Sequence, residues 1–411
     1  MRLLMITAGF LPYEFSENLC NGKLVYAMRE SDISVDVISR SDDGPAYSTE
    51  WKEPWAFLKE NTYELHYDLG NKLTKLVDAA YSGWMMSNHY VEGVRWARRA
   101  YMKALRLMES HYYDAVLTRS PSDIAHLVGY KLKQRKGVRW IANWNDPAEP
   151  IWPEPYRQPL SRRRQLQSER FTRQLLMSAD VNTFPSDFLC RHFVKSFPEL
   201  AGRPTMVIPH IGLSDSLFVR IQNKPSEKLR LCHSGNLSVE RNPELLFAAM
   251  RELCNEGETS LQLDIMGYTN DYVTSLISRY HLQGCVNILG PYPYMSSLEK
   301  MQDYAVLVLI EARMKEGIFF PSKLTDYAQT GRPVLAVSPR SGFVSCAINK
   351  FGGGLAVDND SVEAIKDALR LLLCRWREGT LSSLSSDSLY ARFCPSRVVG
   401  LYGQLIGPSR D

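Results

Sequence analysis

The chain has 411 residues and a mass of 46.9 kDa; 45% of its residues are hydrophobic and 23% are charged. This composition excludes collagen-like and disordered proteins, and the length favours two domains. The net charge of +4 is too small for the dense basic surface that nucleic-acid binding requires, so we expect no nucleic-acid partner. The longest apolar run, Tyr304–Ile310, is far too short to span a bilayer.

The amino-terminal segment reads MRLLMITAGFLPY and precedes the polar stretch SENLCNG. Because it has one basic residue, Arg2, and no small-residue cleavage site, we predict a buried strand rather than a signal peptide. The eight cysteines are widely spaced and form no CxxC pair. This spacing favours reduced thiols in the cytoplasm and argues against a structural zinc site.

The first half alternates strand-like and helix-like segments. Short apolar runs predict strands at Arg2–Thr7, Val35–Ser39, Asp114–Thr118, Arg139–Ala142, Val181–Phe184 and Met206–Ile208. Helical stretches such as Gly22–Glu30 and residues 120–136 follow some of them, and Ser122 is the expected N-cap of the second. Strands that alternate with helices at this spacing predict βαβ units and a parallel sheet.

Residues 41–110 do not fit a minimal domain of this kind. A structureless loop of that length is uncommon, so we predict that this aromatic and basic insert contains helices, most clearly at residues 91–110. That helix fits a solvated amphipathic helix, and a face for an anionic or membrane-borne acceptor is the alternative. The arginine-rich residues 161–173 leave two similar alternatives, a solvated helix face or contact with a lipid-linked phosphate.

The strand and helix pattern restarts after Pro209–Ser214. Further strands are predicted at Leu229–His233, Gln262–Met266, Val286–Leu289, Ala305–Ile310, Pro333–Ala336 and Leu355–Val357. We therefore predict an α/β protein with two doubly wound parallel-sheet domains, at residues 1–210 and 211–392, followed by a C-terminal segment at 393–411.

The most informative segment, residues 311–336, follows the strand that ends at Ile310. Ligands bind outside the carboxyl ends of strands in open parallel sheets, and the glycine of Glu316-Gly317 permits close backbone approach. Pro321 suits the first turn of a helix, and Lys323 in that turn is poorly placed unless an anion is bound there. Asp326, one turn later, can accept hydrogen bonds from two hydroxyls of a ribose.

These groups together predict a nucleoside diphosphate site. An ordinary helix with a solvent-facing Lys–Asp pair is the alternative. The sequence PSKLTDYAQTGRPVLA resembles the PSK-x-x-E-Y-x-x-x-G-x-PV-(L/I)-A stretch of GT-B glycosyltransferases of the group 1, or GT4-like, family. Asp326 stands where that family usually has Glu. Glu316 resembles the first Glu of its E-x7-E element, although nine residues separate Glu316 from Asp326, and Glu311 is a rival.

The sequence LRLCHSGNLSVERNPELLFAAM resembles the first strand and glycine loop of the family's donor domain. The resemblance implies that Gly235 approaches the sugar diphosphate, that Arg241 supplies a cation and that Gly290 faces the base. Asn236 and Asn242 stand where the family usually has basic residues. The implied donor-binding residues are Gly235, Asn236, Gly290, Glu311, Glu316, Gly317, Ser322, Lys323 and Asp326.

The N-terminal half resembles the family's acceptor domain. The opening strand and loop put Gly9 and Phe10 on the acceptor side, and WNDP after a later strand adds Asn145 and Asp146. Asp146 would orient the acceptor hydroxyl or take its proton, whereas an N-cap or Asx turn before Pro147 is the alternative. The C-terminal YARFCPSRVVGLYGQLIG resembles the helix that returns to the first domain.

The resemblance implies a GT-B architecture, with two Rossmann-like domains facing across a cleft. It implies a retaining glycosyltransferase that moves a sugar from a UDP- or GDP-sugar to a hydroxyl of a glycan, lipid-linked glycan or small molecule, as in polysaccharide biosynthesis. The expected catalytic residues are Asp146, Arg241 and Lys323; the two cations would stabilise the departing diphosphate. We expect no metal and no cofactor beyond the nucleotide sugar.

Two alternatives to a transferase stay open. The departures at Asn236, Asn242 and Asp326 suggest a non-catalytic scaffold that binds nucleotide sugars. A nucleotide-sugar epimerase is the other, with His210 and His233 as candidate acid and base groups. Peripheral contact with the inner face of a membrane is an alternative to a purely cytoplasmic location.

Overall fold

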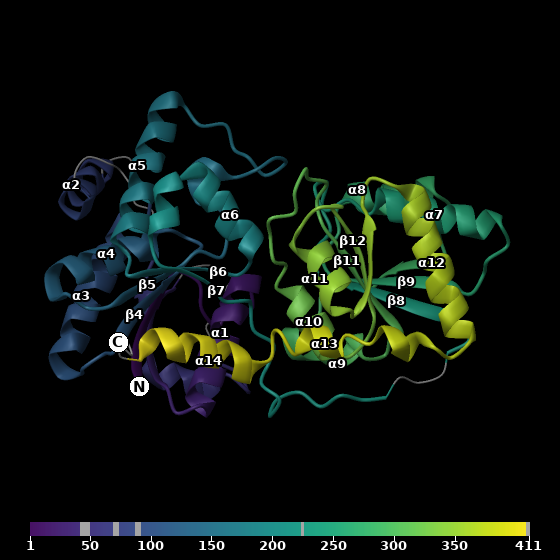
Figure 1. The fold of residues 1–411 in the computed structure, drawn as a ribbon, viewed down its shortest axis with the longest axis horizontal. Coiled ribbons are helices and arrows are strands. Elements are labelled where there is room, and N and C mark those ends of the chain that lie inside the picture. Colours follow the sequence, from purple (N-terminus) through teal and green to yellow (C-terminus); the bar gives the residue numbers. More distant parts are fainter. Residues whose placement is uncertain (42–49, 69–73, 87–91, 223–225, 408–411) are drawn as a thin grey trace. The chain divides into compact units, whose positions relative to one another are not determined.

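The computed structural model describes the chain apart from residues 42–49, 69–73, 87–91, 223–225 and 408–411 (Figure 1). The chain forms two compact units. The first comprises Met1–Pro153, Arg157–Ser214 and Pro395–Asp411, and the second comprises Glu154–Tyr156 and Asp215–Cys394. The sequence places its main divisions at 210/211 and 392/393, and part of the 41–110 insert lies outside the described residues.

The first unit contains a seven-stranded parallel sheet in the order β3-β2-β1-β4-β5-β6-β7. Its strands are β1 (Arg2–Thr7), β2 (Ser34–Ser41), β3 (Thr62–His66), β4 (Ala115–Arg119), β5 (Trp140–Asn143), β6 (Val181–Phe184) and β7 (Thr205–Val207). All six predicted strands are present. The sequence does not predict β3, because an edge strand that is only half-buried needs no apolar run.

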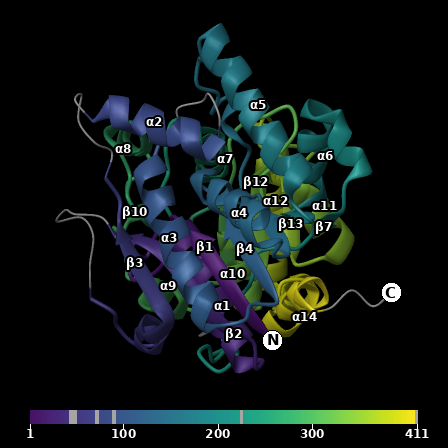
Figure 2. The same cartoon turned by 90° about the vertical axis from the view of Figure 1, so that its left-hand side faces the viewer.

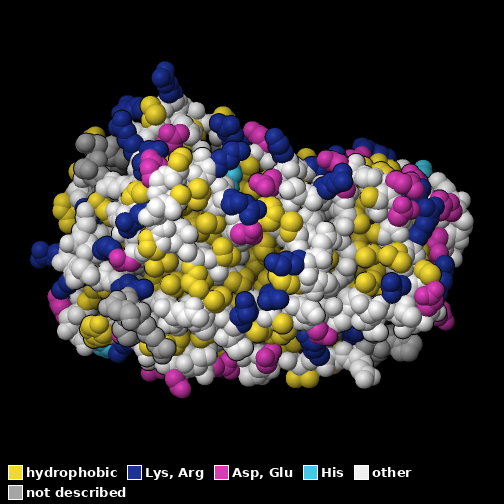
Figure 3. Space-filling view, viewed as in Figure 1, with side chains coloured by type: hydrophobic (Ala, Val, Ile, Leu, Met, Phe, Trp, Pro, Cys, Tyr) yellow, Lys and Arg dark blue, Asp and Glu magenta, His cyan; other side chains and the backbone are white. Residues whose placement is uncertain are grey.

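Seven α-helices and three short 3₁₀ segments accompany this sheet in the described part of the first unit. They are α1 (Ser16–Glu30), η1 (Ala56–Asn61), α2 (Lys75–Met86), α3 (Val94–Ser110), α4 (Ile124–Lys136), η2 (Glu149–Ile151), α5 (Arg162–Ser178), α6 (Asp187–Ser196), η3 (Pro198–Gly202) and α14 (Pro395–Ile406). The helix expected at residues 91–110 is confirmed as α3. The arginine-rich residues 161–173 lie on α5, and Figure 3 shows Lys and Arg side chains gathered over its outer end.

One predicted cap is wrong. The helix α4 begins at Ile124, so the N-cap position falls on Asp123 rather than Ser122, and the Asp123 side chain makes no capping hydrogen bond. The Oγ atom of Ser122 lies 3.5 Å from the Ile124 amide. The chain turns through residues 121–123 before the helix starts, which moves the cap one residue along.

The second unit contains a six-stranded parallel sheet in the order β10-β9-β8-β11-β12-β13. Its strands are β8 (Leu229–Ser234), β9 (Leu261–Met266), β10 (Val286–Ile288), β11 (Val306–Ile310), β12 (Val334–Ser338) and β13 (Gly354–Asp358). Its helical segments are α7 (Glu244–Asn255), α8 (Asp271–Arg279), α9 (Tyr294–Met301), α10 (Lys323–Gln329), α11 (Phe343–Phe351), α12 (Val362–Arg377), η4 (Leu381–Leu384) and α13 (Asp387–Tyr390). All six predicted strands are confirmed.

The apolar faces of α7, α8 and α12 share a core with the central strands of the second sheet. Leu246, Leu276 and Leu369 each come from a different one of these helices and are buried in it. Figure 1 shows α10 and α11 on the other side of the sheet, so helices cover both faces, as in doubly wound folds.

In both sheets the strand order reverses beside the first strand. The reversal lies between β1 and β4 in the first unit and between β8 and β11 in the second. Doubly wound sheets bind ligands outside the carboxyl ends of the strands at such a point. Each unit therefore offers one expected ligand position. Among the described residues, no helix combines the length and the apolar character that crossing a membrane requires.

Candidate functional site

The candidate site of the second unit lies where β8 and β11 end. Gly235 directly follows β8, and Glu311 directly follows β11. The two strands pair in parallel, so these residues leave the same edge of the sheet as neighbours. The helix α10, which follows the β11 loop, supplies Lys323 and Asp326.

Gly235 and Lys323 are in close contact. The φ angle of Gly235 is 128°, a conformation that residues with a side chain rarely adopt. A β-carbon added to Gly235 would collide with the Lys323 Nζ atom. This Nζ atom is buried and has no hydrogen-bond partner among the described residues. The absence of a side chain at Gly235 therefore makes room for an ammonium group above the end of β8.

Burial and a neighbouring cation act together on Lys323. Desolvation and, to a smaller extent, the positive charge of Arg241 lower the pKa of its amino group to about 7, against a weaker opposing effect of Asp326. Burying a charged amino group without a hydrogen-bond partner costs free energy, so burial favours the neutral form. An anion beside the group would favour the charged form instead. The pair of cations thus favours a bound anion at this point.

Glu311 is the second buried titratable group of the site. Its Oε2 atom has no hydrogen-bond partner in the described part of the chain. Burial raises the pKa of this carboxyl to about 8, although the positive charge of Arg241 acts in the opposite direction. At neutral pH the side chain is therefore mainly protonated and can donate as well as accept a hydrogen bond.

Two tyrosines fix the surroundings of Lys323. The Tyr327 hydroxyl accepts a hydrogen bond from the Ser234 amide at 2.7 Å and lies 3.1 Å from the Ser234 carbonyl oxygen, which anchors the end of β8 to α10. The Tyr294 hydroxyl donates to the Asp326 carboxylate at 2.9 Å. Neither tyrosine was predicted as a site residue, although Tyr327 belongs to the motif that contains Lys323.

The two asparagines at positions that are usually basic in the family organise loops. The Asn236 side-chain oxygen accepts a hydrogen bond from the Tyr268 amide at 3.0 Å. The Asn242 side-chain amide donates to the Tyr272 hydroxyl at 2.8 Å. Gly290 has a φ angle of 78°, and its carbonyl accepts from the Gly267 amide at 2.9 Å. These contacts join the loops after β8, β9 and β10 along one edge of the sheet.

The remaining predicted donor residues differ in exposure. Glu316 is exposed, whereas Glu311 is buried beside Arg241. Gly317 is buried, and its amide and carbonyl bond to the backbone of Ser341 and Phe343. Ser322 occupies the N-cap of α10 without a side-chain capping bond. The close backbone approach expected at Gly317 is thus to another loop of the protein. The helix α10 that follows is short, with seven residues.

The two candidate histidines are buried. His233 lies within β8, and its Nδ1 atom donates a hydrogen bond to the Val308 carbonyl at 2.9 Å. Burial and the charge of Lys323 hold the pKa of His233 well below its usual range, so its ring is neutral. His210 is buried in the first unit.

The first unit has a second polar cluster at the ends of β1, β4 and β5. The Asn145 side chain donates to the Glu17 carboxyl group and to the Ser120 carbonyl. Arg119 lies beside Glu17, and its guanidinium donates to the Tyr402 hydroxyl at 2.8 Å. This bond ties the helix α14 to the sheet of the first unit.

A pocket of about 260 Å³ opens beside this cluster. Its lining residues are Ala8, Gly9, Tyr13, Phe15, Glu17, Asn18, Arg40, Pro121 and Ser122. Of the predicted acceptor-side residues, Gly9 lines the pocket and Asn145 contacts one of its walls. The side chain of Phe10 is instead buried, and its carbonyl accepts from Asn18 at 2.8 Å.

Asp146 is part of a group of acidic side chains. Burial raises the pKa of Glu17 to about 8, and the charge of Asp146 adds to this effect while Arg119 opposes it. Burial also raises the pKa of Asp123 to about 7, with smaller contributions from Glu149 and Asp146. The local sequence does not mark Glu17, Arg119 and Asp123 as site residues, because their importance depends on burial and on neighbours distant in sequence.

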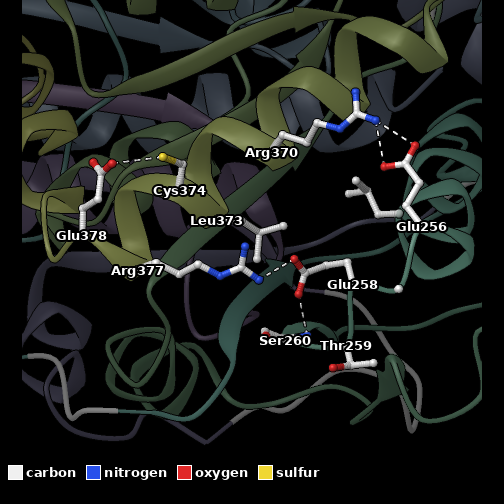
Figure 4. A pocket seen from close by; sticks show the side chains of 11 residues that line it. Glu256, Glu258, Thr259, Ser260, Arg370, Leu373, Cys374, Arg377 and Glu378 are labelled. Carbon is white, nitrogen blue, oxygen red and sulfur yellow. Dashed lines mark hydrogen bonds and ion pairs between the residues drawn. The ribbon is translucent and has the colours of Figure 1, made fainter.

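Another pocket of the second unit, of about 630 Å³, lies away from the candidate site. It is formed between the ends of α7 and α12 and by Thr259 and Ser260, which precede β9 and so lie at the amino ends of the strands (Figure 4). Its charged side chains pair with each other, as Arg370 does with Glu256 and Arg377 with Glu258. In the described part of the chain, no group of His, Cys, Asp or Glu is suited to a metal ion.

Comparisons with known proteins identify a domain in the second unit and support the two-domain fold. Residues 216–378 match the family model described as glycosyl transferases group 1. No curated protein sequence is significantly similar to the chain. Sucrose-phosphate synthase from Thermosynechococcus elongatus is 16% identical, with a TM-score of 0.68 over 98% of both chains.

Two further solved structures have the same architecture. HepE from Anabaena, in complex with UDP and glucose, is 15% identical, with a TM-score of 0.64 over 98% of both chains. The lipopolysaccharide outer core galactosyltransferase WaaB is 14% identical, with a TM-score of 0.62 over 99% of both chains. Residues 216–378 therefore form a group 1 glycosyltransferase domain, and the protein is a glycosyltransferase with the GT-B architecture.

Proposed function

We propose that the second unit binds a nucleoside diphosphate sugar and that the enzyme transfers the sugar, with retention of configuration, to an acceptor hydroxyl. The observation that carries this proposal is the buried Nζ atom of Lys323 above Gly235, which has no hydrogen-bond partner among the residues that the structure describes. An ammonium group held there, with Arg241 close enough to lower its pKa, is matched to a diphosphate.

The same cations explain how transfer would be promoted. The bond between the anomeric carbon and the diphosphate oxygen breaks, and a bond to the acceptor oxygen forms. Negative charge grows on the departing diphosphate, and Lys323 and Arg241 would stabilise that charge. We propose that these two residues do so without a metal ion or any cofactor other than the nucleotide sugar.

Other groups of the second unit would orient the donor. We assign the ribose hydroxyls to the Asp326 carboxylate, which Tyr294 already holds in place. Glu311, protonated at neutral pH, would donate a hydrogen bond to a sugar hydroxyl and add no negative charge beside the diphosphate. Gly235 and Gly290 would let the backbone approach the phosphates and the base.

In the first unit, we assign the acceptor to the pocket beside Gly9 and Glu17. Asp146, in the acidic group that adjoins Glu17, would orient the acceptor hydroxyl or take its proton as the new bond forms. Because HepE is described in complex with UDP and glucose, and WaaB as a galactosyltransferase, a UDP-sugar and a glycan are the first donor and acceptor to test.

The test measures thermal stabilisation by UDP, GDP, ADP and UDP-glucose. We expect a rise in Tm with one nucleotide base, and loss of that rise in Lys323→Ala. Lys228→Ala is the matched control, because this exposed lysine precedes β8, at the end of the strand opposite to Gly235. If no nucleotide stabilises the folded protein, the donor-site proposal fails.

Turnover then separates the remaining alternatives. Transfer of labelled sugar to glycan acceptors, with the anomeric configuration of the product read by NMR, tests the transferase and the stereochemistry. Conversion of one nucleotide sugar into another without an acceptor would indicate the epimerase. Binding without either reaction would indicate a scaffold that has lost catalysis.

A further inference from the structure

The helix α2 has its polar side chains inside and its apolar side chains outside. Asp78 and Ser82 are only 2% and 1% exposed, whereas Leu76, Val77 and Trp84 are 82%, 47% and 56% exposed. Ala79 and Ala80 are exposed as well. A surface helix of a water-soluble domain normally has the reverse pattern.

The helical period makes these two opposite faces. At 3.6 residues per turn, Leu76, Ala80 and Trp84 lie one above another along a single face, and Asp78 and Ser82 lie on the other side. The arrangement is held by α3, because Arg95 pairs with Asp78 and also with Asp68 at 2.9 Å. The partly buried ion pair with Asp78 therefore holds α2 with its apolar face turned outward.

Positive charge borders this apolar face. Val77 and Tyr81 of α2 line a shallow pocket of about 240 Å³ together with Arg95, Arg98 and Arg99 of α3. The Arg98 guanidinium lies 4.7 Å from the centre of the Tyr81 ring. Within the described ranges, neither Arg98 nor Arg99 forms an ion pair with a carboxylate, and both side chains are exposed.

Figure 2 shows α2 on the outside of the first unit, beside α3. The exposed surface of α3 continues the mixed character, with Met102 and Arg106 on the same side of the helix as Arg98. The two helices therefore present an outer surface that combines Leu, Val, Trp and Met with Arg. We name this surface, defined by Leu76, Val77, Trp84, Arg98, Arg99, Met102 and Arg106, the α2–α3 face.

We propose that the α2–α3 face docks on an anionic phospholipid membrane. Apolar side chains that include a tryptophan, flanked by arginines, are suited to the boundary between acyl chains and phosphate head groups. The arginines complement the negative charge of such a surface, and the apolar face enters it. The proposal rests on α2 and α3 alone and is independent of the glycosyl-transfer chemistry in the second unit.

The test is flotation of the full-length protein with vesicles of phosphatidylcholine, with and without phosphatidylglycerol. We expect binding only to the anionic vesicles, and weaker binding at high salt. Leu76→Ser with Trp84→Ser should weaken binding about tenfold or more, because both apolar side chains that would enter the membrane are lost. Arg98→Gln with Arg99→Gln should weaken it by about tenfold or more through lost charge.

Matched controls distinguish binding through the α2–α3 face from nonspecific adsorption to vesicles. Val219→Ser removes an apolar side chain that is exposed in the second unit and should leave binding unchanged. Arg162→Gln with Arg163→Gln removes the same charge from α5, where both arginines are exposed, and should have a much smaller effect than the α3 pair. If the α5 pair abolishes binding and the α3 pair does not, the assignment to α2 and α3 is wrong.

A second measurement does not depend on polar substitutions in α2. Vesicles with brominated acyl chains should quench tryptophan fluorescence, and Trp84→Phe, which keeps an aromatic ring, should remove most of that quenching. The proposal is overturned if no anionic vesicle binds, or if quenching persists in Trp84→Phe. It is also overturned if Leu76→Ser with Trp84→Ser instead abolishes association with another protein molecule in the absence of lipid.

Discussion

The amino group of Lys323 occupies the space above Gly235 that the β-carbon of any other residue would fill. The two residues come from different parts of the glycosyltransferase domain, the end of β8 and the start of α10. Tyr327 maintains their proximity by bonding to the backbone of Ser234, directly before the glycine. Substitution of Gly235 by a residue with a side chain should therefore displace the amino group of Lys323.

We expect Gly235→Ala to abolish stabilisation by a nucleotide sugar, because the new methyl group displaces Lys323. Gly257→Ala is the control: this glycine also has a positive φ, 92°, but an added β-carbon would meet no atom within 4 Å. Both variants should lose roughly 1–2 kcal/mol of stability through backbone strain. Thermal shift with and without UDP-glucose separates strain from binding, and equal retention of binding in both variants would contradict the assigned contact.

Donor binding should be coupled to proton uptake above pH 7. Burial and the charge of Arg241 lower the pKa of free Lys323 to about 7, so at pH 8 the amino group is mostly neutral. A bound diphosphate raises that pKa again, so the complex takes up a proton and affinity falls as pH rises above about 7.

Calorimetric titration of UDP-glucose at pH 8, in buffers of different ionisation enthalpy, gives the number of protons taken up. UDP-glucose is the appropriate ligand because its diphosphate diester does not titrate near neutral pH. Lys323→Arg keeps the charge and should reduce the uptake, leaving any contribution of Glu311. Equal proton uptake in Lys323→Arg and the native protein would show that Lys323 is not its source.

At Glu311, the neutral side chain should be the active form. Burial raises its pKa to about 8, so Glu311→Gln mimics the protonated state at pH 7 and should retain donor binding. Glu311→Ala should weaken binding by about 1–3 kcal/mol, since a buried hydrogen-bond group is removed. Dissociation constants at pH 7 and pH 9 test this: deprotonation of Lys323 should weaken binding in all three proteins, and ionisation of Glu311 should add a further loss only in the native protein. Stronger loss in Glu311→Gln than in Glu311→Ala would contradict this role.

Glu17 should make the native state less stable at high pH. Burial raises its folded-state pKa to about 8, well above the ordinary value of 4.5, so the native state binds more protons between these pH values. Stability therefore falls as pH rises from about 5 to about 8. Glu17→Gln, which cannot ionise, should have a higher Tm than the native protein at pH 8.5 and a similar one near pH 5.

The control for this prediction is Glu109→Gln, which replaces an exposed carboxylate at the end of α3. Its Tm should follow that of the native protein at every pH. A Glu17→Gln curve parallel to the native one across the range would mean that ionisation of Glu17 does not limit stability.

The sequence is sufficient to predict the strands of both sheets and part of the candidate site. Twelve strands were predicted from short apolar runs, and each is present; most of them are buried, because central strands of a covered parallel sheet must be apolar on both faces. Lys323 and Asp326 could be found because a motif within one helix places them one turn apart. Gly235 could be found because a glycine after a strand is a local signal.

What the sequence could not decide depends on burial and on contacts between distant segments. The protonation of Glu17 and Glu311 follows from desolvation inside the assembled units, and the composition around either residue in the chain does not show it. Likewise, α2 has an ordinary mixture of polar and apolar residues, and the pairing of Asp78 with Arg95 in the folded unit holds its apolar face outward. Local periodicity determined the strands and helices, whereas the tertiary structure decided which side chains lost water and which kept it.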